Sequence, residues 1–457
     1  MKVKKSRSLP TTARKRRWLG SCYHYRSFFS WFYLTLAVLS CLAEAQDLTL
    51  LGGELTTDLA GRAAIQVFAP NILEEHKTAQ LEGFTPFHNR FNRKSGLGPA
   101  FINRACGDCH VSNGRGPVRI RSSSSRLTTV VVKISKGNFA DGTPKNIPGL
   151  GEQLQDSTLS GLANFGLQIN WTVNPFLFPD GSKVLGRFPT VSFSLPTPVP
   201  NFVGVSLRMS PILIGVGLIE AIPTETILAL SDPDDTNGDG ISGRPQYVPD
   251  LENNTKILGR FGFRASHTTI VQQSGAAAFN DMGITNRYFP NESSGTLELS
   301  NKDLDDLLVY LALAGVPAAR NQSDPPVLHG KELFSAIGCA DCHVMTLTTG
   351  THQFTELENQ TIHPFTDLLL HDMGKGLSDT RPEFEASASE WRTTALWGIG
   401  FSSTVSDVKP RYLHDGRART IEEAILWHGG EARRAQRNYQ RLEKEAREDL
   451  ISFLNSL

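Results

Sequence analysis

Hydrophobic residues recur at helical spacing in several segments of the chain. In residues 300–314 the leucines lie three and four positions apart, and Ser300 and Asp303 have the spacing of a capping box. Residues 328–338 form a second amphipathic segment, which ends at a glycine. A third begins with a capping box at Thr420, and its apolar stripe ends at His428. These patterns predict a mainly α fold.

Strands are predicted only in the first half of the chain. Residues 126–134 and 167–173 are rich in β-branched side chains, which is typical of strands. The polar stretch 318–326 predicts a linker between an N-terminal domain, residues 46–320, and a C-terminal domain, residues 327–457. The N-terminal domain is the larger and therefore must contain insertions. Residues 213–218 and 396–401 share a pattern of glycine and large apolar residues, which fits a duplication.

The first 45 residues have the composition of a secretory signal peptide. Nine Lys and Arg residues precede an apolar run from 28 to 42, and Ala43 and Ala45 form a small-residue cleavage site. A lipid-attachment site at Cys41, a twin-arginine signal and a single anchor helix are the alternatives. We expect a periplasmic protein that contacts a membrane only if a lipid is attached at Cys41.

Removal of this leader changes the net charge. The whole chain has 46 basic and 46 acidic residues. The leader contains nine of the former and one of the latter, so the other 412 residues carry 37 basic and 45 acidic groups, a net charge of −8. A mildly acidic protein gives no support to nucleic-acid binding.

The cysteines outside the leader form two pairs, and each pair is followed directly by a histidine. The C-x-x-C-H motifs are Cys106, Cys109 and His110, and Cys339, Cys342 and His343. In such motifs both thiols add to the vinyl groups of a haem, and the histidine becomes the proximal iron ligand. A redox pair would not require a histidine at this position in both copies, and a zinc site would not require motifs that are 233 residues apart. The sequence therefore predicts two covalently bound haem c groups, one in each of two cytochrome c-like domains.

The sixth ligand of each iron is predicted from the remaining histidines and methionines. Residues 111–266 contain no histidine, and Met209 is their only methionine. We therefore expect the first haem to be open, although a later residue could fold back to it. His428 is the candidate for the second haem, with His414 and Met373 as alternatives.

Five segments carry a resemblance to a known family. Residues 412–425 strongly resemble the C-terminal signature of bacterial di-haem cytochrome c peroxidases and of their relative that matures methylamine dehydrogenase. Residues 96–99 with 113–116, residues 259–263 and residues 369–374 resemble one branch, the di-haem oxidoreductase family. The resemblance implies that the N-terminal haem reacts with peroxide. It also implies that the C-terminal haem relays electrons from a small redox protein, a cytochrome c or a cupredoxin.

The resemblance also bears on iron ligation. Fourteen residues after the histidine that corresponds to His414, the relatives have Met or Tyr as distal ligand, and this chain has His428. That implies bis-histidine ligation by His343 and His428, which departs from the classical peroxidases. The peroxidases also place a histidine soon after the first motif. Its absence here is closer to the maturation enzyme, in which the iron stays open.

Peroxide cleavage needs an acid–base group above the open iron. Glu220, in an otherwise apolar stretch, is the first candidate. Gln272, Gln273 and Asp281 are the second, because they occupy the region where the peroxidases have Gln and Glu-Met.

An acidic loop predicts a calcium site. Asp235, Asn237 and Asp239 have the spacing of the first half of an EF-hand, but Gln246 replaces its final Glu. The related peroxidases bind calcium, whereas an Asx-rich turn is the alternative.

Together these features predict a di-haem oxidoreductase that reduces hydrogen peroxide. The alternatives are an electron-transfer cytochrome in which both irons are six-coordinate, and a di-haem enzyme that oxygenates an organic substrate or modifies a protein.

Overall fold

The structure, a computed structural model, describes most of the chain after the leader. The described residues are 48–61, 64–116, 129–163, 166–194, 203–291, 295–405 and 409–457. The predicted signal peptide, including Cys41, lies outside them. Leu48–Leu457 form one compact unit. The division into domains at residues 46–320 and 327–457 stays a prediction.

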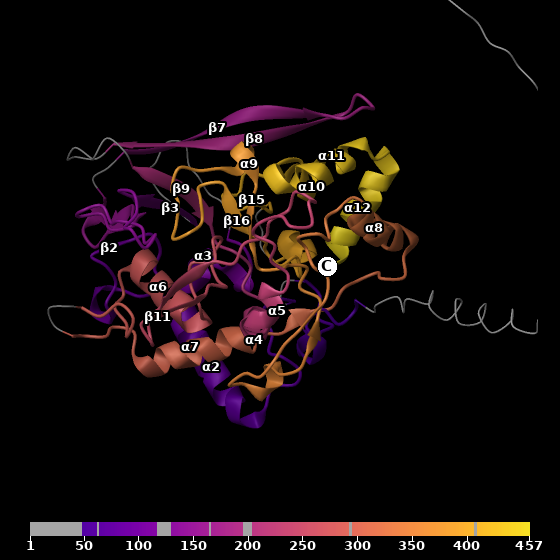
Figure 1. Ribbon diagram of the computed structural model, residues 1–457. Helices are drawn as coiled ribbons and strands as arrows, with labels where there is room; N and C mark the ends of the chain where they lie inside the picture. Colours follow the sequence, from indigo (N-terminus) through magenta and orange to yellow (C-terminus); the bar gives the residue numbers. More distant parts are fainter. Residues whose placement is uncertain are drawn as a thin grey trace, which may run out of the picture. The chain divides into compact units, whose positions relative to one another are not determined.

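Helices occur in two groups, before residue 110 and after residue 215 (Figure 1). They are α2 (Glu74–His88), α3 (Cys106–Cys109), α4 (Val216–Ala221), α5 (Thr224–Leu228), α6 (Ile270–Met282), α7 (Asn301–Ala312), α8 (Pro325–Ala336), α9 (Gly374–Leu377), α10 (Ile421–Leu426), α11 (Arg433–Arg441) and α12 (Lys444–Ser456). Short 3₁₀ turns are η1 (Gly53–Leu55), η3 (Arg93–Ser95), η4 (Val111–Asn113), η5 (Thr355–Leu357), η6 (Ile399–Ser403) and η7 (Gly430–Ala432).

The strands form small sheets of two or three strands each. They are β1 (Thr56–Thr57) with β12 (Val316–Pro317); β2 (Ala100–Phe101) with β5 (Ser157–Thr158) and β6 (Gly161–Leu162); β3 (Val130–Ser135) with β4 (Gln153–Leu154) and β9 (Gly204–Met209); β7 (Gly166–Leu177) with β8 (Lys183–Ser194); β10 (Tyr247–Asp250) with β11 (Thr255–Leu258); β13 (Leu347–Thr348) with β14 (Thr361–Ile362); and β15 (Leu370–Asp372) with β16 (Glu390–Arg392).

The prediction of a mainly α fold was wrong. Helices are accompanied by many short strands and by the β7–β8 hairpin, in which the strands pair over twelve residues each. The strand predicted at residues 167–173 lies within β7, and the described part of the one at residues 126–134 lies in β3. The sequence analysis missed β8 and β9. Most other strands have only two to four residues, which is too short for an alternating pattern to be recognised.

In two pairs of packed helices, a glycine of one helix lies directly against the backbone of the other. Helix α2 crosses α7, and α8 crosses α12 (Figure 1). In the first pair, a side chain at Gly83 would collide with the backbone of Asp306. In the second pair, a side chain at Gly330 would collide in the same way with the backbone of Asp449. Glycine is therefore needed at both crossings, because any Cβ atom would push the helices apart.

The repeated segments at residues 213–218 and 396–401 interlock where the two helix pairs meet. Gly215 and Gly398 both have left-handed backbones, with φ of 66° and 72°, and each precedes a helical turn. A Cβ atom at Gly215 would collide with Trp397, and one at Gly398 would collide with Ile214. Each segment thus packs its large apolar side chain on the glycine of the other, which supports the duplication indicated by the sequence.

The predicted helix starts are confirmed. The side chain of Ser300 accepts a hydrogen bond from the Asp303 N–H at the start of α7, and Thr420 caps α10 in the same way at Glu423. These caps fix where both helices begin.

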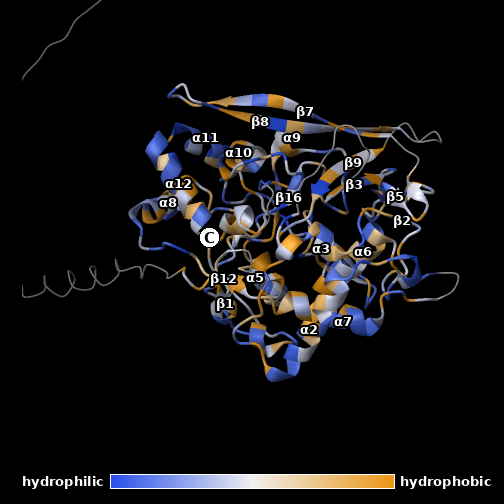
Figure 2. Cartoon of the chain, turned by 180° about the vertical axis from the view of Figure 1, so that it is seen from behind, coloured by the Kyte–Doolittle hydropathy of each residue, from blue (hydrophilic) through white to orange (hydrophobic). Residues whose placement is uncertain are grey.

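The β7–β8 hairpin extends along one edge of the unit, next to α9 and α10 (Figure 1). Hydrophilic and hydrophobic residues alternate along it (Figure 2). Among the residues that the structure describes, no helix has the length and apolar character needed to span a membrane.

Candidate functional site

A cavity of about 470 Å³ lies in the interior, and both C-x-x-C-H motifs line it. Its wall is mostly apolar and includes side chains from α6, α7, α10 and α11. The cavity therefore brings together two motifs that are 233 residues apart in the sequence.

The first motif forms the short helix α3. The Nδ1 atom of His110 donates a hydrogen bond to the carbonyl oxygen of Pro211 at 2.9 Å, which leaves Nε2 free to bind a metal. Burial lowers the pKa of His110 to about 4, so the imidazole is neutral at pH 7. Burial also raises the pKa of Cys106 to about 12.

The second motif has the same arrangement. His343 Nδ1 donates to the carbonyl oxygen of Phe365 at 2.9 Å, and burial lowers its pKa to about 4. Partial burial likewise raises the pKa of Cys339 to about 12. The four described cysteines form no disulfide. Two pairs of thiols and two neutral imidazoles with a free Nε2, all facing one largely apolar cavity, fit two covalently attached haems.

The comparison with family models decides the assignment. Residues 199–301 and 292–457 match the model described as "Di-haem oxidoreductase, putative peroxidase". The chain belongs to this di-haem oxidoreductase family. The second motif lies within the matched residues, whereas the first precedes them. No curated protein and no solved structure gives a match.

In this di-haem oxidoreductase His428 lies near the second motif. Its Nδ1 donates to the Ala424 carbonyl oxygen at 2.8 Å, so its Nε2 is also free. His428 lines the cavity and is close enough to His343 to lower the pKa of that imidazole further. For His110 no such partner contributes, and its pKa reflects burial and the Pro211 carbonyl.

The two alternatives to His428 also line the cavity. The ring of His414 stacks on Trp391 with centroids 3.6 Å apart, and burial lowers its pKa to about 3. Met373 packs in the apolar cluster around Trp391. Its side chain is the thioether alternative beside the second motif.

His371 lines the same cavity, but both of its ring nitrogens are engaged. Its Nε2 lies 2.8 Å from Asp367 Oδ2, and its Nδ1 lies 2.7 Å from Glu431 Oε2 and 3.7 Å from Cys342 Sγ. Burial alone would lower the pKa of His371, but these partners raise it well above its usual value. Because Glu431 also accepts hydrogen bonds from Ser242, this network holds the segment directly after His428 in place.

Helix α6 provides an acid near the first motif, in addition to Asp108 within the motif itself. One face of this helix, including Gln273 and Asp281, lines the cavity. Gln153 donates from Nε2 to Asp281 Oδ1 at 2.6 Å, and burial raises the pKa of the Asp281 carboxyl group. The charge of Asp281 also raises the pKa values of Cys106 and Cys109, which shows that the carboxyl group is near the first attachment site.

The other two predicted acid–base residues lie elsewhere. Gln272 is held by Thr268 and by the Pro249 carbonyl oxygen and does not line the cavity. Glu220 is not part of the lining either. Its Oε1 accepts the N–H of Ile270 at 2.7 Å, at the start of α6, and its Oε2 lies 3.3 Å from His352 Nε2. The structure thus separates Glu220 from both motifs.

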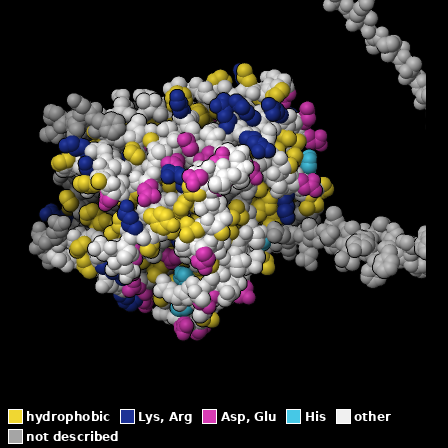
Figure 3. Space-filling view, in the orientation of Figure 1, with side chains coloured by type: hydrophobic (Ala, Val, Ile, Leu, Met, Phe, Trp, Pro, Cys, Tyr) yellow, Lys and Arg dark blue, Asp and Glu magenta, His cyan; other side chains and the backbone are white. Residues whose placement is uncertain are grey.

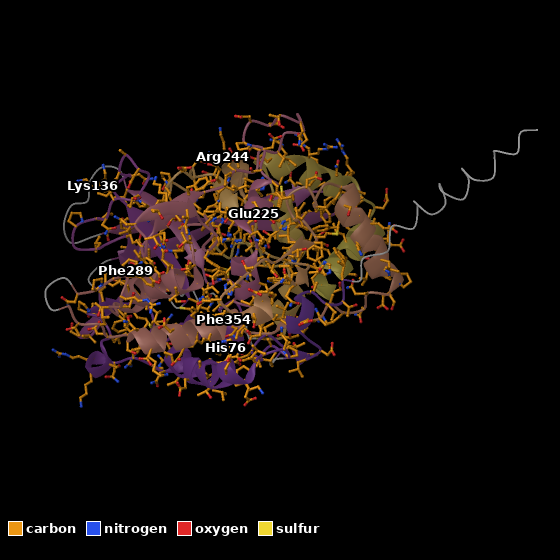
Figure 4. All side chains as sticks on the ribbon, turned by 60° about the horizontal axis from the view of Figure 1, so that its bottom comes forward. His76, Lys136, Glu225, Arg244, Phe289 and Phe354 are labelled. Carbon is orange, nitrogen blue, oxygen red and sulfur yellow. The ribbon has the colours of Figure 1, made fainter. Side chains whose placement is uncertain are left out.

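His352 lies beside Phe354, whose ring packs edge-on against His76 of α2 with centroids 5.1 Å apart (Figure 4). His76 also bonds to Glu356 at 2.7 Å. The Glu220 carboxylate therefore belongs to a polar cluster that ties α2 to residues 352–356.

The sequence analysis missed His267, which lines the cavity and is the first histidine after the histidine-free stretch. Burial lowers its pKa to about 4. It lies near a buried charged group in which Glu383 Oε2 pairs with Arg208 at 2.7 Å and with Arg381 at 3.2 Å. No helical pattern marks His267, because it lies in a loop before α6.

In the acidic loop at residues 235–241, side-chain oxygens accept hydrogen bonds from backbone N–H groups of the same loop. Asp235 Oδ1 accepts a hydrogen bond from the N–H of Gly240 at 3.1 Å. Asn237 Oδ1 accepts one from the N–H of Asp239 at 2.9 Å. Asp239 Oδ1 accepts one from the N–H of Ile241 at 2.8 Å. Asp239 also lines the cavity near the second motif.

Proposed function

We propose that this di-haem oxidoreductase is exported to the periplasm and reduces hydrogen peroxide at the first haem. Two electrons and two protons convert one peroxide molecule to two water molecules, and the electrons arrive through the second haem. The observation that carries the proposal is the asymmetry of the cavity. A second imidazole, that of His428, lies near His343, whereas a half-buried acid, Asp281, lies near the first motif.

The residues that would hold the two haems are those of the motifs. Cys106 and Cys109 would attach the first through thioether bonds, with His110 as proximal ligand, and Cys339, Cys342 and His343 would hold the second, with His428 as distal ligand. When bound, the first haem supplies an iron that binds peroxide, and the second stores and passes electrons. Arg115, Lys133, Arg208 and Arg392 line the same cavity and would balance the charge of haem carboxylates.

Asp281 is suited to move a proton within bound peroxide. Because Gln153 donates to Oδ1, a proton taken up by this carboxyl group would be carried at Oδ2. Burial raises the pKa of this carboxyl group, which favours the protonated form that general acid catalysis needs. Gln273 lies on the same helix face and would orient the peroxide by hydrogen bonding. The apolar wall excludes competing water from this space.

Electrons would cross the region where the repeated segments interlock. Trp397 lines the cavity and packs against Gly215 at this junction. Its buried indole gives this region an aromatic side chain between the two helix pairs.

Calcium binding by Asp235, Asn237 and Asp239 is part of the proposal. The described carboxylate and amide oxygens already accept backbone N–H groups, as they do in EF-hand loops and in simple turns alike. A bound ion would brace the loop against the second motif, because Asp239 and Asp341 are near each other.

The deciding experiment mixes the reduced di-haem protein with hydrogen peroxide in a stopped-flow spectrometer. We expect oxidation of both haems and consumption of one peroxide for each two electrons. Absence of any reaction would reject the peroxidase function and favour an electron-transfer cytochrome.

A further inference from the structure

Helix α11 presents a row of arginines. Its nine residues include Arg433, Arg434, Arg437 and Arg441, all exposed, and no acid. Among the residues that the structure describes, none of the four has an ion-pair partner within 4.0 Å. Lys375 in α9 lies exposed beside the turn that precedes the helix. Lys and Arg side chains gather over the region of α10 and α11 (Figure 3).

The remaining polar residues of α11 fix the helix to the second motif. Asn438 Nδ2 donates to the Ile337 carbonyl oxygen at 3.2 Å, two residues before Cys339. Gln436 Nε2 donates to the Leu426 carbonyl oxygen at 2.5 Å, and the buried Tyr439 bonds to Glu422 at 3.0 Å. Hydrogen bonds therefore fix α11, which carries the arginines, to the segment before Cys339 and to α10.

The arginine row also borders the cavity. Arg434 and Ala435 line it together with Cys339 and Asp341, and Asp341 itself is exposed. The attachment edge of the second haem site therefore reaches the molecular surface beside α11. Among the described helices of eight or more residues, α11 alone contains basic residues and no acid. The charge of Arg434 also acts on Asp341.

This local charge contrasts with that of the rest of the chain. Beyond the predicted leader, the net charge is −8, so a positive surface at this place is not a general property of the protein. Unpaired arginines on a firmly held helix attract a negatively charged protein surface and orient it during encounter. Arginine is also the basic residue that pairs best with carboxylates in two-point contacts.

We propose that the α11 arginines form the docking surface for an acidic redox protein, which exchanges electrons with the second haem through the adjacent edge. The inference rests on the proposed function, because it assigns the electron donor to a surface of the same site. Each encounter passes one electron between the metal of the partner and the iron of the second haem, with no proton or ligand exchanged.

The test measures electron transfer from the reduced di-haem protein to an oxidised partner, a direction that needs no peroxide. Ferrous di-haem protein is mixed in a stopped-flow spectrometer with an oxidised cupredoxin of net negative charge, so that Fe²⁺ becomes Fe³⁺ and Cu²⁺ becomes Cu⁺. The variant carries Arg433→Glu and Arg437→Glu. The control carries Arg93→Glu and Lys94→Glu in η3, which are also exposed and change the charge equally.

At low ionic strength we expect the α11 variant to react about tenfold or more slowly than wild type, because charge steering contributes about 10–10³ in rate. The control variant should react like wild type. Added salt should slow the wild type and bring the two proteins together. With a cupredoxin of net positive charge, wild type should react slowly and the α11 variant faster.

Equal rates for wild type and the α11 variant would overturn the proposal. So would equal rates of wild type with acidic and with basic cupredoxin, a measurement that needs no variant. If the α11 variant lost only its binding to phosphatidylglycerol vesicles, the row would be a lipid-binding surface instead. Because peroxide is absent throughout, a failure of the peroxidase function would leave these rates unchanged.

Discussion

The first motif, at α3, and the second, after α8, belong to equivalent helix pairs. Gly83 meets the backbone of Asp306 as Gly330 meets that of Asp449, and each proximal histidine donates from Nδ1 to a backbone carbonyl oxygen. Their surroundings differ. His428 and Arg434 of α11 lie near the second motif, whereas Asp281 of α6 lies near the first.

This difference separates the parts of the molecule that would attach a haem from the parts that would determine how each haem reacts. The common helix pairs and the histidine–carbonyl bonds would present a haem in the same way twice. The added segments would supply a ligand, His428, in one case and a half-buried acid, Asp281, in the other. A change confined to one site therefore tests this comparison, with the other site as the reference.

Removal of the attachment cysteines should have the largest effect. Cys106→Ala with Cys109→Ala should abolish covalent haem at the first motif, and Cys339→Ala with Cys342→Ala should do so at the second. Each double variant should retain one haem by mass spectrometry of the denatured chain. Two haems in either variant would show that the motifs do not attach them.

Asp281→Asn should slow the reaction with peroxide by about 10²–10⁴-fold, the range of general acid–base catalysis. Asparagine can still accept the Gln153 hydrogen bond, so the local packing is kept. Stopped-flow mixing with peroxide measures the rate. Glu220→Gln is the matched control, since Glu220 lies outside the cavity lining. If Glu220→Gln slowed the reaction and Asp281→Asn did not, the assignment of the acid would be reversed.

His428→Ala should change the spin state of the second haem alone. In the ferric wild type, electron paramagnetic resonance should show one high-spin and one low-spin haem, and the variant should lose the low-spin signal. Two low-spin signals in wild type would favour the electron carrier. An unchanged low-spin signal in the variant would transfer the ligand role to His414 or Met373.

Gly83→Ala and Gly330→Ala should each destabilise the protein by about 1–3 kcal/mol, because the added methyl group would collide with backbone at a helix crossing. Thermal unfolding followed by circular dichroism measures the loss. Gly137→Ala is a control, since nothing lies within 4 Å of its would-be Cβ atom, although its φ of 74° adds some strain. A much smaller loss at one crossing would show that the two helix pairs are not equivalent.

Calcium should have the smallest effect. If Asp235, Asn237 and Asp239 bind the ion, a chelator should lower the melting temperature, because a ligand bound only to the native state stabilises it. Superimposable melting curves with calcium and with chelator would mean that the loop is a turn held by its own N–H groups.

Much of the second site could be predicted from the sequence because its signals are local. The capping box at Thr420 and the stripe that ends in His428 lie within nine residues, and the structure has both. The first site depends on contacts between distant segments. No local pattern distinguishes Asp281, which lines the cavity, from Glu220, which caps α6.

The strand content could not be predicted for a related reason. Strands such as β4 and β13 have two residues each, and they exist because a distant partner supplies the hydrogen bonds. His267 was missed because its position depends on a loop that closes onto Phe261. The spacing of residues in the sequence does not predict this contact between Phe261 and His267.

The β7–β8 hairpin has a consequence for solubility. A ribbon of two strands has two outer edges, and an uncovered edge invites pairing with strands of other molecules. Part of the β8 edge is covered, because Glu423 accepts the Arg187 N–H and Arg419 donates to the Leu185 carbonyl oxygen. Pro175 in β7 and Pro189 in β8 lie within the paired register, and proline fits in a strand only where its nitrogen faces away from the ladder. Each one therefore removes a donor from an outer edge. Together with the exposed Lys183 at the start of β8, they would keep this long ribbon from acting as a template for aggregation.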